Sequence, residues 1–278
     1  MALRIITDST AYLEQAFIEK HSITVIPLTY LFDGAVCEEG LPGTYDAVYA
    51  RIRAGAALPR TSQPPLRAYY DAFEQALAGG NHVLGVFLSS KISGTYAAAC
   101  AAAKSFANPN LVLVDSHTSA FGLRLLIEKA LERHRKGQYF KRIVDGMIAD
   151  SARIRVELVV ENLDCLIRGG RLTGAAVAAG KLLGIVPVIA LKDGALGAAG
   201  KFRGQQRALA DCMARIPAGV SRIGVMHVMA LERAQAFAQK LQARFPQAKI
   251  DFQQVGPIVG GHVGPGAIGL CYEEAPGC

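Results

Sequence analysis

The sequence lacks tryptophan, paired cysteines and any recognisable metal-binding spacing. Aromatic residues make up only 7% of the chain, so its interior has to be built mainly from alanine, valine, leucine and isoleucine. Six cysteines are scattered along 278 residues without a Cys-x-x-Cys pair, and no spacing typical of metal ligands occurs. We therefore expect reduced thiols, no metal and no cofactor.

The chain also lacks a secretory signal and an uninterrupted membrane span. Its first residues lead straight into a predicted strand at Leu3–Thr7, which leaves no room for a signal peptide, so we expect a cytoplasmic protein. The most apolar stretch, Leu172–Leu191, has nearly the length of a span, but Lys181 and Pro187 interrupt it. This stretch is predicted to be a helix followed by a buried strand.

The first half of the chain alternates short apolar runs with helical stretches, which predicts a Rossmann-like parallel sheet covered by helices on both faces. Polar residues follow several of these runs, at the strand ends where such sheets bind ligands, although helix capping explains them equally well. The expected strands are Leu3–Thr7, Ile23–Leu31, Val83–Leu88 and Leu111–Val114, and the expected helices are Ala11–Lys20, Leu66–Ala78, Gly94–Phe106 and Thr118–Lys136.

The second half follows a different pattern, typical of an α+β domain with a mixed sheet. Asp193-Gly194 is a strong turn signal between Val186–Leu191 and Ala195–Ala198, which predicts a hairpin. We expect an N-terminal α/β domain at residues 1–152 and a C-terminal α+β domain at 153–278. Further strands are expected at Val156–Glu161, Ile223–Val228, Ile250–Val255 and Ala267–Tyr272, with helices at Gly174–Leu183, Gln205–Arg215 and Ala230–Phe245.

Positive charge is concentrated in the second half. Residues 1–152 hold 15 Lys and Arg against 14 Asp and Glu, whereas residues 153–278 hold 15 against 9. The segment 164–207 is the most basic part, and it predicts an acidic partner or a transient contact with an anionic membrane surface. A solvated basic face without a partner is the alternative. Nucleic acid is not expected, because aromatic residues are not interleaved with the basic ones.

Three segments far apart in the sequence carry hydroxyls, flexible backbone and one imidazole. They are Thr61–Pro64, which the flanking prolines predict to be an extended loop, Ser89–Thr95 at the start of a helix, and the glycine-rich Gly260–Gly266, predicted to be a tight loop around His262. Free N–H groups where a helix begins bind anions, and Gly94 allows close approach. If the segments meet, this is chemistry for holding an anion. No nucleotide fingerprint is present.

An acyl-transfer enzyme with Ser93 as nucleophile and His262 as base is the alternative to a binding protein. It is less favoured, because the Gly-x-Ser-x-Gly motif is missing and no acidic residue is placed to orient the imidazole. A protein-interaction module that holds lipid incidentally is a third hypothesis.

The order and spacing of several short motifs resemble the DegV family of bacterial fatty-acid-binding proteins, which includes the B subunits of fatty acid kinase. The resemblance covers nearly the whole chain. The motifs that carry it are Asp8-Ser9-Thr10, Thr61-Ser62-Gln63-Pro64, Ser89–Tyr96, Val114-Asp115-Ser116, Leu166–Leu172, Arg203-Gly204 and His262–Gly269.

The resemblance implies a two-domain carrier that is not itself an enzyme. It would bind one long-chain fatty acid, such as palmitate, with the tail in an apolar tunnel mostly in the second domain, and would present the carboxylate to a separate ATP-dependent kinase subunit. By similarity, the carboxylate site comprises Thr61, Ser62, Ser93, Gly94, Thr95 and His262. The residues expected to meet the kinase are Arg168, Arg171 and Arg203.

Two positions depart from the family pattern. The loop Cys37–Gly43 matches it poorly, and Gly261 stands where many members carry threonine. Both leave the details of the pocket entrance open. A small-residue helix at Gly174–Gly184 would leave room for the tunnel, and close helix–sheet packing is the alternative reading of these residues.

Overall fold

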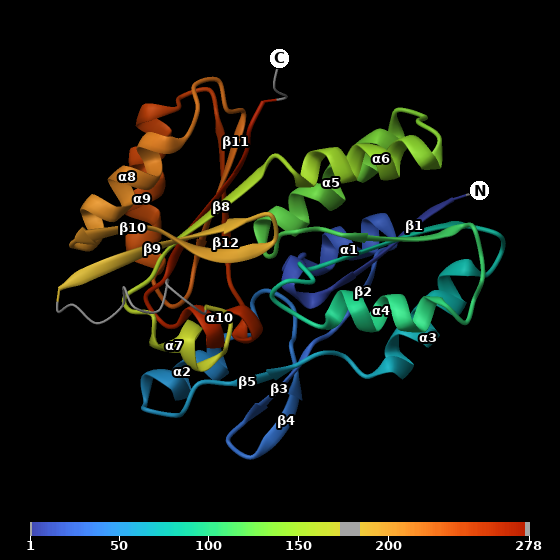
Figure 1. The fold of residues 1–278 in the computed structure, drawn as a ribbon, viewed down its shortest axis with the longest axis horizontal. Helices are drawn as coiled ribbons and strands as arrows, with labels where there is room; N and C mark the ends of the chain where they lie inside the picture. Colours follow the sequence, from blue (N-terminus) through green and yellow to red (C-terminus); the bar gives the residue numbers. More distant parts are fainter. Residues whose placement is uncertain (1, 173–183, 276–278) are drawn as a thin grey trace.

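Four short apolar strands in the first half of the chain form the expected parallel sheet. The computed structural model describes residues 2–172 and 184–275, and the order of the strands in this sheet is β2-β1-β6-β7, with every neighbouring pair parallel (Figure 1). The strands are β1 (Leu3–Asp8), β2 (Thr24–Ile26), β6 (His82–Phe87) and β7 (Leu111–Asp115).

Helices cover both faces of this sheet, because alternate strand residues point to opposite sides. Ile6 and Phe87 pack against one helical layer, formed by α3 (Leu66–Leu77) and α4 (Thr95–Ala103). Their neighbours Ile5 and Val86 pack on the other side with leucines of α5. The helices associated with that side are α1 (Gln15–His21), α5 (Phe121–Arg135) and α6 (Phe140–Ser151), and the short 3-10 helix η1 (Ser9–Ala11) follows β1.

The second half forms a six-stranded mixed sheet, as its pattern predicts. The order is β10-β9-β8-β13-β11-β12, in which only β11 and β12 are parallel. The predicted hairpin joins β9 to β10, and Asp193 and Gly194 both adopt the positive φ that such a turn requires. The strands are β8 (Ile154–Val159), β9 (Ile185–Lys192), β10 (Ala195–Arg203), β11 (Arg222–His227), β12 (Lys249–Gln254) and β13 (Ile268–Glu273).

One face of the mixed sheet is covered by α8 (Gln205–Arg215) and α9 (Leu231–Arg244). The other face turns toward the parallel sheet. Among the described residues, no helix is both long and apolar enough to cross a membrane. The predicted helix Gly174–Leu183 lies outside the described residues.

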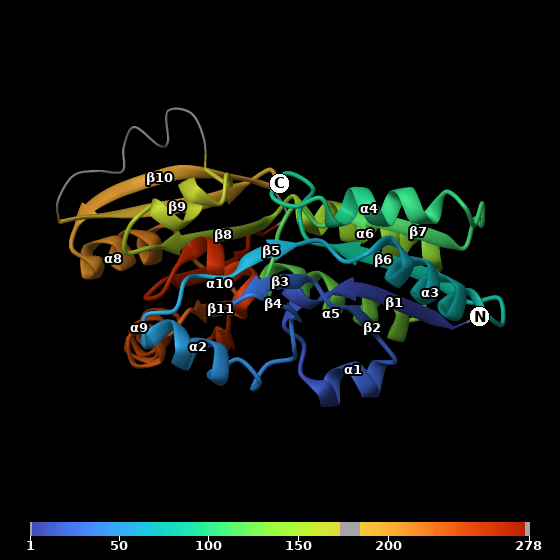
Figure 2. The ribbon, with the colours of Figure 1, turned by 90° about the horizontal axis from the view of Figure 1, so that it is seen from below.

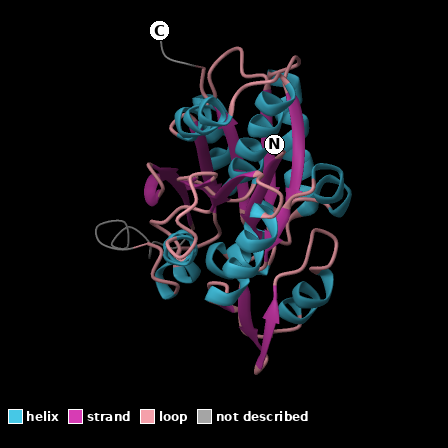
Figure 3. Ribbon diagram, turned by 90° about the vertical axis from the view of Figure 1, so that its right-hand side faces the viewer, coloured by secondary structure: helices cyan, strands magenta, loops and turns pink. Residues whose placement is uncertain are grey.

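A small third sheet, which the sequence did not predict, lies between the two large ones. The single strand expected at Ile23–Leu31 is wrong: Pro27 lacks an N–H for the ladder, so the chain leaves β2 and starts a new strand. The loop expected around Thr61 is also partly wrong, because it pairs with β3 as an edge strand. The third sheet consists of β3 (Thr29–Phe32), β4 (Ala35–Glu38) and β5 (Arg60–Ser62), and α2 (Asp46–Arg53) lies between β4 and β5 in the sequence. The β3–β4 ribbon projects from the molecule (Figures 1 and 3).

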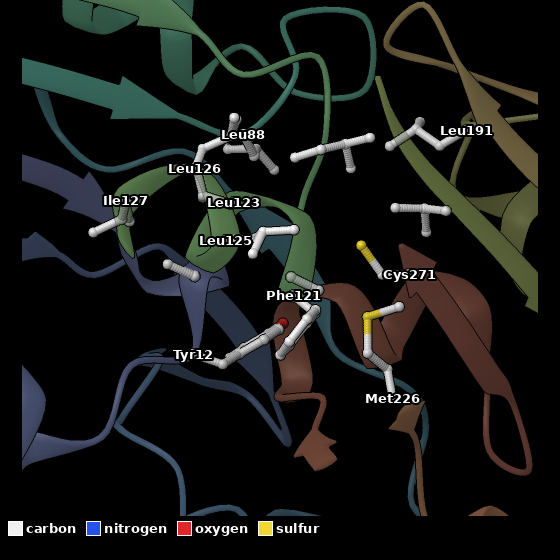
Figure 4. Close-up of a cluster of buried hydrophobic side chains, with 14 of the residues drawn as sticks. Tyr12, Leu88, Phe121, Leu123, Leu125, Leu126, Ile127, Leu191, Met226 and Cys271 are labelled. Atoms are coloured by element: carbon white, nitrogen blue, oxygen red, sulfur yellow. The ribbon is translucent and has the colours of Figure 1, made fainter. Parts of the chain in front are cut away.

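The two large sheets share one hydrophobic core. Phe121, at the start of α5, lies close to Tyr12 from the first half and to Met226 and Cys271 from the second (Figure 4). The sheets divide where expected, since α6 ends at Ser151 and β8 begins at Ile154, but the core runs across that division. The assignment of two domains at 1–152 and 153–278 therefore stays a prediction.

Replacing Gly224 with alanine tests this shared core. A Cβ at Gly224 of β11 would overlap the ring of Phe121, whereas a Cβ at Gly197 of β10 would meet no atom within 4 Å. We expect Gly224→Ala to lower the free energy of unfolding by about 1–3 kcal/mol, measured by urea denaturation. Gly197→Ala is the matched control and should change it by less than about 0.5 kcal/mol. Equal effects of the two substitutions would contradict the close contact.

Candidate functional site

A cavity of about 360 Å³ lies between the mixed sheet and the end of the parallel sheet. Its walls come from β5, the loop after β6, the short helices α7 (Asp164–Arg168) and α10 (Pro257–Val263), and the inner face of the mixed sheet. In two views at right angles, β5 and α10 lie near the junction between the half of the molecule built on the parallel sheet and the half built on the mixed sheet (Figures 1 and 2). Helix α10 contacts both α7 and β5. The cavity is thus assembled from both halves of the chain.

The three hydroxyl- and glycine-bearing segments meet at one end of this cavity. Thr61 Oγ1 lies 2.8 Å from His262 Nε2, within hydrogen-bonding distance. Residues from the expected carboxylate site that line the cavity are Thr61, Ser62, Ser93, Gly94 and His262. Thr95, the sixth, is fully buried behind them.

His262 lies in a helix, so the tight loop expected for this segment is wrong. Pro257 supplies the first turn of α10, and Gly264, with φ of +82°, follows its end. The glycines inside the helix serve packing: a Cβ at Gly260 would lie 2.7 Å from the Tyr49 hydroxyl, and one at Gly261 would lie 2.9 Å from the Pro59 carbonyl oxygen. A glycine at 261 therefore fits the close approach of α10 to Pro59.

Ser93 is held in place by its neighbour Thr95. Their hydroxyl oxygens lie 2.8 Å apart, and the Thr95 N–H donates to Ser93 Oγ over 3.3 Å. A Cβ at Gly94 would overlap the side-chain oxygen of Gln63, which is the far end of an exposed, flexible side chain. Gln63 also lines the cavity, and the sequence argument had not assigned it a role.

The loop that carries Ser93 is fixed to the parallel sheet by a buried carboxylate. Asp8, at the end of β1, accepts hydrogen bonds from the Thr10 N–H and, over 2.8 Å, from the Leu88 N–H at the start of that loop. Burial raises the pKa of Asp8 to about 6, against the lowering effect of these hydrogen bonds. The capping interpretation of Asp8-Ser9-Thr10 is thus correct locally, and the same carboxylate also positions the Ser93 loop.

Arg171 faces the cavity, although the sequence argument assigned it to a partner surface. Its guanidinium donates to the Gly169 carbonyl oxygen over 2.6 Å and to the Ile92 carbonyl oxygen over 3.1 Å. No carboxylate lies within ion-pair distance of Arg171 in the described part of the chain. Arg168 and Arg203 are exposed, as a docking role requires.

His262 is neutral at physiological pH. Burial, and then the positive charge of Arg171, lower its pKa to about 4. A neutral imidazole can accept a hydrogen bond at one ring nitrogen and donate at the other. The site therefore holds the hydroxyls of Thr61, Ser62 and Ser93, an imidazole and one guanidinium, which together can bind a carboxylate.

The remaining walls are mostly apolar, with Ser119 and His227 as the polar exceptions. The sequence analysis placed several of the apolar lining residues in predicted strands, but an apolar run alone does not show which strand residues pack against helices and which border an open cavity. The apolar lining residues are Leu28, Leu88, Ile92, Ala120, Val156, Leu158, Leu166, Leu191, Leu196, Met226, Val228, Val255, Ile258, Val259, Val263 and Ala267.

The geometry favours holding an anion over acyl transfer. The recorded partner of Ser93 Oγ is Thr95, and that of His262 Nε2 is Thr61, so the two are not hydrogen-bonded to each other in the described structure. None of the described residues that line the cavity is acidic, so none can orient the imidazole as the third group of a catalytic triad.

Comparison with known proteins links this geometry to one family. The family model described as "Uncharacterised protein, DegV family" matches residues 2–275. A DegV domain-containing protein of Deinococcus radiodurans is 33% identical over 98% of this chain and 99% of its own length.

Two solved structures of related proteins superpose over nearly the whole chain. A Thermus thermophilus DegV family protein, described as fatty acid binding, has a TM-score of 0.89 and 29% identity, covering 99% of this chain and 100% of its own. A stearic acid-binding protein of Eubacterium ventriosum has a TM-score of 0.85 and 26% identity, covering 97% of both chains.

The ionisation of His262 can be tested directly. Because its pKa is lowered, we expect the imidazole to stay neutral between pH 5 and 8, with ring nitrogen chemical shifts that do not titrate in this range. The measurement is a pH series of nitrogen-15 NMR spectra of the histidine side chains. Exposed His117 is the internal reference. A His262 titration near pH 6.5 would contradict the burial and the effect of Arg171.

Proposed function

This chain belongs to the DegV family, and on that premise we propose that it binds one long-chain fatty acid, with the carboxylate at the Thr61–Ser93–His262 end and the tail along the apolar walls. The observation that carries the proposal is the cavity itself, whose walls are mostly apolar, with hydroxyls and the His262 imidazole gathered beside Arg171, which forms no ion pair among the described residues. Its volume of about 360 Å³ is in the range of small-molecule sites, roughly 300–1,000 Å³.

The tail supplies most of the binding energy in this proposal. Burying some fifteen methylenes contributes roughly 0.8 kcal/mol each, or about 12 kcal/mol before the costs of ordering the chain and the protein. The polar end contributes less, about 1–3 kcal/mol for each hydrogen bond to the carboxylate. It therefore fixes which way round the ligand lies.

Each polar residue at the head end has a distinct part in this proposal. Thr61 and Ser93 donate hydroxyls to the carboxylate, while neutral His262 orients the Thr61 hydroxyl from 2.8 Å. Thr95 holds Ser93, and Gly94 lets the ligand approach the backbone. Arg171 supplies the positive charge that a buried carboxylate needs.

The ligand class is inferred from the relatives. One is described as fatty acid binding and another as stearic acid binding, and the single polar end of this cavity fits a saturated or unsaturated acid of similar length, such as palmitate. We do not assign enzymatic activity to the chain.

We also propose that the bound carboxylate is presented to an ATP-dependent fatty acid kinase subunit. Ser62 and Gln63 are exposed at the head end, so a partner could reach the carboxylate from outside. Exposed Arg168 and Arg203 would contact that partner, consistent with the positive charge of segment 164–207, which also fits a transient contact with an anionic membrane surface.

The head-group roles are tested by isosteric substitution. We expect Thr61→Val and Ser93→Ala each to weaken the affinity for palmitate by about 5- to 150-fold, because each removes one hydrogen bond to a charged group. The affinity would be measured by displacement of a fluorescent fatty acid. Thr24→Val, in a half-buried strand outside the cavity, is the matched control. If both site variants bind like the control, the head group lies elsewhere.

The kinase proposal is tested with charge reversals. Arg168→Glu and Arg203→Glu should lower the rate at which a fatty acid kinase subunit phosphorylates the bound acid, because they remove positive charge from the expected interface. Affinity for the fatty acid should not change, since neither residue lines the cavity. An unchanged phosphorylation rate would show that Arg168 and Arg203 do not belong to the interface with the kinase subunit. A parallel loss of affinity for the fatty acid would show that they act on the cavity instead.

A further inference from the structure

Glu39 is a buried carboxylate without a neutralising cation among the described residues. Only 3% of it is exposed, and none of the ion pairs in the described structure includes it. Burial raises its pKa to about 8, although hydrogen bonds from Ser9 and Ile258 oppose the rise. A carboxyl group with this pKa is largely protonated at neutral pH, which avoids much of the cost of burying a charge without a cation.

Glu39 joins three separate segments through its side chain and its backbone. Oε2 accepts a hydrogen bond over 2.7 Å from the hydroxyl of Ser9, which directly follows β1, one of the two inner strands of the parallel sheet. Oε1 accepts one from the Ile258 N–H over 2.8 Å, in the first turn of α10. The Glu39 N–H donates to the Leu28 carbonyl oxygen over 2.8 Å, and the Leu28 N–H donates to Ser9 Oγ.

From Glu39, the β3–β4–β5 sheet leads to Thr61 and α10 leads to His262, the two partners of the Thr61–His262 hydrogen bond. On one side, β4 ends next to Glu39 and pairs with β3, whose Tyr30 lies opposite Thr61 of β5. On the other side, α10 runs from Ile258 to His262, one helical turn later on the same face. Glu39 therefore lies at the start of both paths that lead to the Thr61–His262 contact, one through the β3–β4–β5 sheet to Thr61 and one along α10 to His262.

The groups packed around Glu39 leave it little freedom to move. A Cβ at Gly256 would lie 2.5 Å from Oε1 and 2.8 Å from the Tyr12 ring. The Tyr12 hydroxyl accepts a hydrogen bond from the Val259 N–H, and Tyr45 packs edge-on against Tyr12. Asp8 is the other carboxylate that acts on Glu39, and it too is held by backbone N–H groups.

We propose that Glu39 is a positioning residue for the head-group site, which sets the approach of His262 to Thr61 by fixing the first turn of α10 to the β3–β4–β5 sheet. The relevance of this role to ligand binding rests on the proposed function, but the contacts of Glu39 that position α10 are a property of the ligand-free protein. Glu39 directly follows β4, so the segment Cys37–Gly43, expected to be a loop, is partly strand; the sequence analysis noted it only because it matches the family pattern poorly.

The test compares Glu39→Gln with Glu39→Leu. Glutamine keeps an oxygen that can accept from the Ile258 N–H and an amide that can donate to Ser9, whereas leucine keeps the bulk and removes both contacts. We expect Glu39→Leu to shift the ring nitrogen resonances of His262 in ligand-free protein and to weaken palmitate affinity about tenfold or more. Glu39→Gln should restore the wild-type His262 resonances and an affinity within about threefold of wild type.

Two control variants separate positioning from general destabilisation. Leu241→Ala removes buried contacts in the α8–α9 layer, away from the cavity, and should lower stability without moving the His262 resonances. Glu38→Leu changes the exposed neighbour of Glu39 and should leave both readouts unchanged.

The outcomes distinguish this proposal from the proposed function. If Glu39→Leu leaves the His262 resonances unchanged, or shifts them no more than Leu241→Ala does, the positioning role is wrong, whatever the affinity. It is equally wrong if Glu39→Gln fails to restore them. If the wild-type protein binds no palmitate while the His262 resonances respond as expected, the proposed function fails and the positioning role stands.

Discussion

The hydrogen bond between Thr61 and His262 closes the site, and the other features of the cavity depend on it. It joins residues 201 positions apart, one on an edge strand and one on a short helix. Its geometry requires glycine at 169, because a Cβ there would overlap the imidazole, and glycine at 264, which ends α10 at positive φ. The motif glycines are therefore explained by close approach and backbone conformation around one contact.

The apolar walls and the polar end of the cavity differ in what they can contribute to binding. Its walls are mostly aliphatic and come from both halves of the chain, so binding of an acyl chain would be driven by burial of apolar surface. The polar end contains hydroxyls, a neutral imidazole and Arg171, whose guanidinium is held by two carbonyl oxygens. Because a fixed cation needs no reorganisation when an anion arrives, in the proposed function this end would select the charged group of the ligand and its direction.

Sequence reasoning predicted the two large sheets and named most of the residues that meet at the Thr61–His262 end of the cavity, but not how these parts are connected. Short apolar runs predicted the strands, and Asp193-Gly194 predicted the hairpin. The third sheet was missed because Pro27 splits an apolar run that reads as one strand, and α10 was missed because its glycines suggested a loop. Arg171 and Glu39 could not be placed, since whether a charged side chain faces solvent, a cavity or a buried backbone N–H depends on tertiary packing.

The most direct test of the account is to purify the protein under native conditions, extract it with organic solvent and identify the extract by mass spectrometry. The account predicts about one long-chain fatty acid per protein chain, lost from a Thr61→Val, Ser93→Ala double variant after the same purification. A protein that carries no fatty acid and takes up none when palmitate is added would contradict it, and the cavity would then require a different ligand.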